Sequence, residues 1–236
     1  MRYIVLFVVL VFASFSTVNA DNKVKKTVNK SNGEQWISLM DASKWKGYKM
    51  DKLPPHWTIA KDLITCKGEG GDMACDIITK DKFADFELTL EWKLSSEGNS
   101  GIMYHILELP EYNYTYESGP EYQLLDDLNF PGKETLKPGQ FTASDYDMYP
   151  APKTKILKPV GEWNVARIVF KNHHVVYYLN GSKTAEFNVW SDDWFARRAK
   201  SKWANITGWG MAGCGSIGLQ DHGHGVWFRD VKIRKL

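Results

Sequence analysis

The 236-residue sequence contains few cysteines and almost no excess of charge of either sign. Its three cysteines, Cys66, Cys75 and Cys214, cannot all pair within the chain, and a disulfide between Cys66 and Cys75 and free thiols both remain open. No Cys-x-x-Cys motif occurs, and the cysteine spacing does not fit a zinc site. Because 30 Lys and Arg residues nearly balance 28 Asp and Glu residues, we expect no electrostatic attraction to nucleic acid or to an anionic membrane.

An apolar run occupies residues 4–15, after the basic Arg2 and before the small-residue motif Val18-Asn19-Ala20. This pattern predicts a secretory signal peptide over residues 1–20, which is too short to be a membrane span. Residues 21–33 are rich in Lys, Asn, Ser and Thr and are expected to form a flexible leader. We therefore expect a periplasmic or secreted protein in which residues 34–236 form a single domain.

What the sequence does contain is a series of short β-forming stretches. Residues 83–94 alternate between apolar and polar side chains, which predicts a half-buried strand. Further strands are expected at residues 57–60, 63–67, 76–79, 102–107, 120–125, 163–171, 175–179 and 184–189. A helix is predicted over residues 192–203, with Ser191 as its N-cap. This arrangement predicts an all-β, two-sheet sandwich or jelly roll with one short peripheral helix, and the long segment 126–159 is expected to form functional loops.

Residues 213–228 place titratable side chains among glycines, between two β-forming stretches. His222 and His224 lie beside Asp221 there. Dense glycine next to titratable groups is typical of a place where the backbone comes close to a ligand. The simpler interpretation is a hairpin of strands 217–220 and 226–233 with both histidines at an exposed tip.

Residues 119–127 form a second polar cluster. On a strand, Glu121 and Gln123 would point to one face, and Tyr122 and Leu124 to the other. A carboxylate beside an amide suits a reader of sugar hydroxyls, or a catalytic base with the group that orients it. A strand face that is merely solvated is the alternative.

Several spaced blocks carry a family resemblance over most of the chain: residues 57–59, 76–79, 83–88, 99–102, 119–123, 161–164, 179–181, 219–223 and 226–229. In this order they resemble the 3-keto-disaccharide hydrolase family, and residues 190–194 are similar to an insertion in its Bacteroidetes-type secreted members. The resemblance implies a concanavalin A-like β-sandwich, or jelly roll, that acts on glycosides already oxidised at C3. It also implies a sugar 3-dehydrogenase acting upstream on the same oligosaccharide or glycoside.

A ketone at C3 acidifies the C2 proton, so a base removes it and the C1 substituent leaves by β-elimination, with later addition of water. This chemistry needs a base, an acid for the leaving oxygen and a donor to the enolate. A histidine ordinarily titrates near neutral pH, so His222 is predicted as base or acid, with Glu121 as its partner. The expected substrate-binding residues are Lys93, Tyr104, His105, Gln123, Gln220, Asp221 and Arg229.

Other functions remain open. His105 stands where many members of the family carry arginine, and His224 is an additional histidine, which favours an altered sugar preference. The sequence requires no cofactor and assigns no metal ligands, although Glu121, Asp221, His222 and His224 could bind a divalent metal. A non-catalytic carbohydrate-binding sandwich is one alternative. A conventional glycosidase that pairs Glu121 with Asp126 is another, since their spacing is similar to that in laminarinase-type enzymes, but Gln123 replaces the middle carboxylate there.

Overall fold

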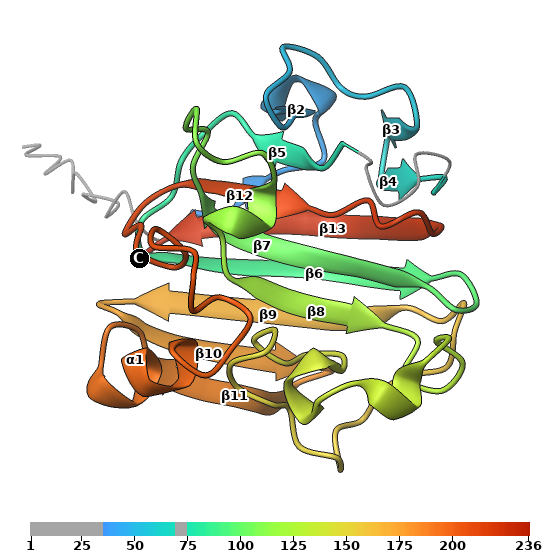
Figure 1. Cartoon of the computed structure of the whole chain (residues 1–236). Helices are drawn as coiled ribbons and strands as arrows, with labels where there is room; N and C mark the ends of the chain where they lie inside the picture. Colours follow the sequence, from blue (N-terminus) through green and yellow to red (C-terminus); the bar gives the residue numbers. More distant parts are fainter. Residues whose placement is uncertain (1–34, 69–74) are drawn as a thin grey trace, which may run out of the picture. The chain divides into compact units, whose positions relative to one another are not determined.

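The computed structural model describes residues 35–68 and 75–236. The predicted signal peptide over residues 1–20 and the leader over residues 21–33 lie outside these residues. Two antiparallel sheets face each other, as Figure 1 shows. The large sheet contains, in spatial order, β11 (Ser182–Asn188), β10 (His174–Leu179), β9 (Asn164–Lys171), β6 (Phe86–Leu94), β13 (Val226–Lys235), β4 (Leu63–Cys66) and β3 (Trp57–Ala60), with β1 (Ile37–Ser38) pairing beside β13.

The small sheet carries the face on which the polar residues gather. Its strands are, in spatial order, β2 (Trp45–Gly47), β5 (Ile77–Thr79), β12 (Ser216–Leu219), β7 (Asn99–Ile106) and β8 (Glu121–Leu125). Short 3-10 helices interrupt the loops: η1 (Ala42–Lys44), η3 (Thr115–Glu117), η4 (Lys133–Thr135) and η5 (Pro138–Gln140). The prediction of an all-β sandwich with a short peripheral helix is therefore confirmed.

Alternation along the strands sends apolar side chains into the space between the sheets. On β6, Phe86, Leu88, Leu90, Trp92 and Leu94 are all buried, as the sequence predicts. Tyr122 and Leu124 of β8 reach the same core from the small sheet. Each sheet thus buries one face, and the opposite face of the small sheet is left free to hold polar groups.

The helix α1 (Asp192–Arg198) begins where the sequence predicts and ends earlier. Ser191 caps it, because its Oγ accepts a hydrogen bond from the Trp194 N–H at 3.3 Å. The helix was expected to continue to Trp203, but the chain turns after Arg198, whose guanidinium donates to the Ile206 and Thr207 carbonyls. This early end releases residues 199–215 to run beside the small sheet as loops (Figure 1).

The segment 213–228 is not a hairpin. Its first strand, β12, belongs to the small sheet, whereas β13 belongs to the large sheet. The chain between them, residues 220–225, therefore crosses from one sheet to the other, and it carries Asp221 and His222 with it. The prediction of an exposed hairpin tip is wrong for this reason.

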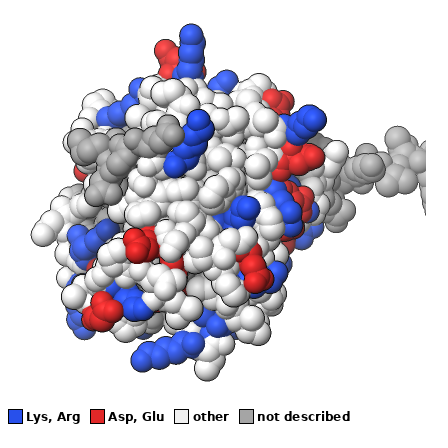
Figure 2. Space-filling view, turned by 90° about the vertical axis from the view of Figure 1, so that its right-hand side faces the viewer, with Lys and Arg blue, Asp and Glu red and all other residues white. Residues whose placement is uncertain are grey.

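Charged side chains of both signs are interspersed over the face that Figure 2 shows. This distribution agrees with the near-neutral charge of the sequence. The three cysteines are free thiols, with Cys66 buried and Cys214 exposed. Among the described residues, no helix is long and apolar enough to cross a membrane.

Candidate active site

A pocket of about 300 Å³ lies on the free face of the small sheet. Its lining comes from seven separate parts of the chain: Asp76, Asn99, Tyr114, Tyr116, Glu121, Gln123, Tyr146, Lys202, Gln220, Asp221 and His222. The sheet supplies Asn99 from β7 and Glu121 and Gln123 from β8. Loops supply the remaining walls. Five of the predicted site residues, Glu121, Gln123, Gln220, Asp221 and His222, therefore converge in one pocket.

Glu121 and Gln123 are held on this face by the pleat of β8. Both are buried, with only 4% and 2% of their surface exposed, while the intervening Tyr122 lies in the core. The Gln123 amide nitrogen donates weakly to Asn99 Oδ1 at 3.4 Å. Gly101 of β7 lies next to the Glu121 side chain, and a Cβ atom at Gly101 would be only 2.1 Å from Glu121 Oε1. The Glu121 carboxyl group therefore fits in this space only because residue 101 is glycine and has no side chain.

Burial controls the charge of two carboxyl groups in the pocket. It raises the pKa of Glu121 to about 7, and the negative charge of Asp76 raises this pKa further while the Lys202 ammonium lowers it. Burial also raises the pKa of Asp76 to about 7, although the Thr115 hydroxyl and the Asp221 N–H donate hydrogen bonds to its carboxylate. Near neutral pH, both groups can thus accept and release protons.

The crossing segment is tied down by Asp221. Its backbone N–H donates to Asp76 Oδ1 at 2.9 Å, and its carboxylate accepts from the Gly223 N–H at 3.1 Å and lies 3.1 Å from His56 Nε2. Gly223 has a φ of 77°, which favours glycine at this turn. These contacts fix the backbone on both sides of His222, whose ring forms part of the pocket wall. Asp221 therefore acts as a support for the turn.

His222 is partly buried, and its ring stacks at 6.5 Å on the ring of His224. His224 contacts the His222 carbonyl oxygen through its Nδ1 at 2.9 Å and does not line the pocket. Within the described residues, no group of three His, Cys, Asp or Glu side chains is arranged to hold a metal ion. The cluster of Glu121, Asp221, His222 and His224 considered from the sequence is thus not assembled as one donor set.

Four predicted substrate-binding residues lie elsewhere. Tyr104 is fully buried between the sheets, where its hydroxyl accepts a hydrogen bond from Tyr177 at 2.9 Å. His105 is buried against Phe170, at 4.4 Å between ring centroids, because its φ of 54° breaks the alternation of β7.

Lys93 and Arg229 project from the large sheet on the side away from the core. Their cations lie over the Trp163 ring at 5.1 and 4.2 Å, and Arg229 also pairs with Glu91 at 2.6 Å. The structure thus places Lys93, Tyr104, His105 and Arg229 outside the pocket that Glu121 lines.

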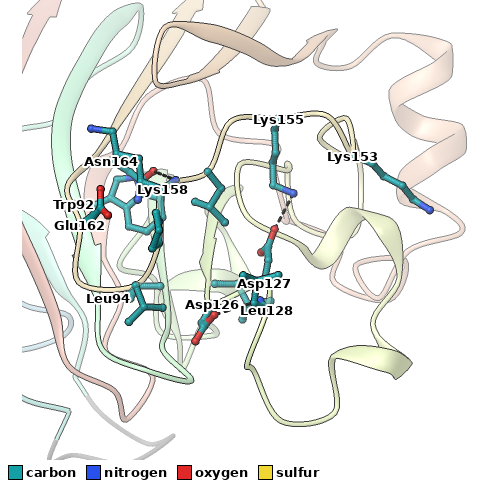
Figure 3. A pocket seen from close by; sticks show the side chains of 14 residues that line it. Trp92, Leu94, Asp126, Asp127, Leu128, Lys153, Lys155, Lys158, Glu162 and Asn164 are labelled. Carbon is teal, nitrogen blue, oxygen red and sulfur yellow. Dashed lines mark hydrogen bonds and ion pairs between the residues drawn. The ribbon is translucent and has the colours of Figure 1, made fainter.

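Asp126 lies at a different pocket, of about 230 Å³, where β6 and β8 end (Figure 3). Its carboxylate accepts hydrogen bonds from the backbone N–H groups of Glu97, Leu128 and Asn129, which lower its pKa against the effect of burial. Next to it, Asp127 forms an ion pair with Lys155, with 2.8 Å between Asp127 Oδ2 and Lys155 Nζ. Asp126 is thus a structural cap of the loop and does not share a pocket with Glu121.

Sequence reasoning missed Lys202, Asp76, Asn99 and the tyrosines of the pocket. Lys202 was predicted to lie near the end of a helix, where a cation suits the helix dipole. The signal that could have found it is the aromatic sequence around it, with Trp203 and Trp209 close by. Nothing in the sequence singled out His56, which lies against Asp221.

The comparisons with known proteins agree on a family. The model of the 3-keto-alpha-glucoside-1,2-lyase-like domain matches residues 35–234. A 3-keto-disaccharide hydrolase of Bacteroides thetaiotaomicron is 36% identical, over 85% of this chain and 78% of its own. Among solved structures, a protein of Parabacteroides distasonis, assigned by name only as a glycosyl hydrolase, is 35% identical, with a TM-score of 0.79 over 86% of this chain and 94% of its own.

A more distant likeness concerns the fold alone. A carbohydrate-binding module of Bacillus subtilis, CBM66, is 10% identical, with a TM-score of 0.51 over 81% of this chain and 96% of its own. It shares the β-sandwich architecture and says nothing further about the site. Both the family match and the relative above 30% identity extend over most of the sequence. The chain belongs to the family of 3-keto-alpha-glucoside-1,2-lyase-like domains.

Proposed function

We propose that this protein cleaves glycosides that carry a ketone at C3, by removing the C2 proton and eliminating the C1 substituent. Water then adds to C1 and a proton returns to C2, so the net reaction is hydrolysis. The observation that carries the proposal is Glu121: a buried carboxyl group whose pKa is about 7, at the floor of a polar pocket. A base of this strength is matched to removing a carbon-bound proton near neutral pH.

We assign the individual proton transfers to Glu121 and its neighbours. Glu121 takes the C2 proton, and His222 at the pocket wall donates a proton to the leaving oxygen when the C1–O bond breaks. Gln220 has a buried side-chain oxygen for which the described residues provide no hydrogen bond. Since buried polar atoms are rarely left unpaired, we assign it to a sugar hydroxyl, together with Gln123 and Asn99.

The first test compares a nitrophenyl glucoside with its 3-keto form, for both anomers and with and without chelator. Release of nitrophenol from the keto form only, and its loss in Glu121→Gln, is the expected result. Release from the unoxidised glucoside would instead favour a conventional glycosidase. Sugar binding without any release, as in a binding module, would also contradict the proposal.

The proposal also extends to the place of the reaction. If the predicted signal peptide over residues 1–20 is cleaved, the enzyme acts outside the cytoplasm on an oligosaccharide or glycoside. Its substrate must then be supplied by an enzyme that oxidises the C3 hydroxyl of a sugar, which is a dehydrogenase reaction. Fractionation of cells that express the full chain, with N-terminal sequencing of the product, tests the export step.

A further inference from the structure

We propose that Lys202 is the electrophilic catalyst of this site: its ammonium group binds the C3 oxygen and stabilises the negative charge that forms there as the C2 proton leaves. The inference rests on the proposed function and adds to it the group that makes the site selective for an oxidised sugar. A C3 hydroxyl develops no comparable charge when the C2 proton is pulled.

The surroundings of Lys202 leave its positive charge available. Its Nζ lies 4.1 Å from the ring centroid of Tyr146, 4.3 Å from that of Trp203 and 5.7 Å from that of Tyr116. Within the described residues, no carboxylate oxygen lies within ion-pair distance of this nitrogen. Aromatic faces attract a cation without neutralising it. The groups in direct contact with the ammonium are therefore neutral rings at the pocket wall.

The backbone around Lys202 is fixed by hydrogen bonds to one neighbouring loop and by stacked indole rings. The Lys202 N–H donates to Asp147 Oδ2 at 2.8 Å, and the Trp203 indole N–H donates to the Tyr146 carbonyl at 2.9 Å. The Trp203 ring stacks on Trp209 at 4.8 Å, and Trp209 stacks in turn on Trp194 of α1 at 5.8 Å. Such preorganisation is what an oxyanion-stabilising donor needs, because it avoids reorganisation during the reaction.

The location of Lys202 suits this role. Glu121 and Lys202 line the same pocket, and the charge of each acts on the other. The ketone oxygen and the C2 proton are on adjacent carbons of the sugar, so a base and a cation in one small pocket can address both. Desolvation lowers the pKa of Lys202, which makes its N–H groups stronger donors to a developing oxyanion.

Proton abstraction can be measured separately from elimination. A 3-keto-1,5-anhydroglucitol has no leaving group at C1, so in D₂O the enzyme can only exchange its C2 proton, which NMR follows directly. We expect Lys202→Met to slow both this exchange and nitrophenol release from the keto glucoside by about 10²–10³-fold, the range for loss of one oxyanion donor. Lys202→Arg should recover part of both rates. Lys200→Met, an exposed position in the same segment, is the matched control.

Each result decides between the proposals. If wild type cleaves the keto glucoside and Lys202→Met, folded with an unchanged Tm, exchanges the C2 proton at the wild-type rate, the role of Lys202 is refuted and the proposed function stands. A sugar attached to Lys202 after borohydride reduction would also overturn it, because it would show a covalent imine. If wild type neither exchanges nor cleaves, the proposed function itself fails, and this role with it.

Discussion

Adding one methyl group at Gly101 should disable the site without unfolding the protein. The Cβ of Gly101→Ala would lie 2.1 Å from Glu121 Oε1, 2.8 Å from its Cδ and 2.9 Å from its Cγ. Because ordinary contacts between such atoms exceed about 3.4 Å, the carboxyl group must move by about 1 Å or more. A displacement of about 1 Å at a catalytic group costs about 10²-fold in rate, which corresponds to about 2.7 kcal/mol of transition-state stabilisation.

The fold should tolerate the same change. The clashing atoms are the end of a flexible side chain at a pocket, and alanine loses less backbone entropy on folding than glycine, an effect of about 0.5–1 kcal/mol. We expect kcat/KM on a 3-keto glucoside to fall about 100-fold, while urea unfolding changes little. Gly213→Ala is the control, since its Cβ would have Trp190 at an ordinary 3.5 Å. An active Gly101→Ala variant, or one that is inactive because it is unfolded, would refute the reasoning.

Three further predictions concern charged side chains, two of them the Glu121 carboxyl group and one Arg229. The raised pKa of Glu121 means that the folded protein binds its proton more tightly than the unfolded chain does, so stability is lost as pH rises from 4.5 to about 7. Glu121→Gln should therefore unfold in urea with a free energy higher than wild type at pH 8, by up to about 3 kcal/mol, and with little difference at pH 4. In wild type, exchange of the C2 proton, a step that needs the base but no acid for a leaving group, should become faster as pH rises through about 7, where Glu121 ionises; a pH-independent exchange rate would exclude it as the base. Arg229→Met should leave kcat/KM unchanged, because Arg229 lies over Trp163 on the large sheet and outside the pocket; a loss above tenfold would show instead that Arg229 acts on the substrate.

The strands and their buried faces could be predicted because they depend on local alternation. Residues 86–94 show this most clearly, and the Ser191 cap is equally local. The pairing of strands is not local. β12 and β13 are separated by only six residues and read as a hairpin, yet β13 pairs with β6 and β4, and β12 pairs with β5 and β7. Which sheet a strand joins depends on partners that are distant in sequence, and a single sequence gives no signal for them.

The site residues also differ in whether local alternation predicts them. Glu121 and Gln123 could be predicted because parity on one strand sets their direction, and parity also sends Tyr104 into the core, against the prediction. His105 departs from the alternation of β7 because its φ is positive, and the neighbouring residues in the sequence do not predict this conformation. Lys202 needed knowledge that the helix stops at Arg198 so that its loop can return to the small sheet.

One backbone unit joins the proposed base to the proposed electrophile. The Tyr146 N–H donates to the Glu121 carbonyl at 2.9 Å, and the Tyr146 carbonyl accepts from the Trp203 indole, next to Lys202, at 2.9 Å. The strand that carries Glu121 is anchored by Tyr122 in the core, and the loop that carries Lys202 is anchored by the stacked indoles. Two rigid parts are therefore connected through a single peptide segment. The separation of negative and positive charge in the pocket is set by this connection, so it does not rely on a direct ion pair that would cancel both charges before the substrate arrives.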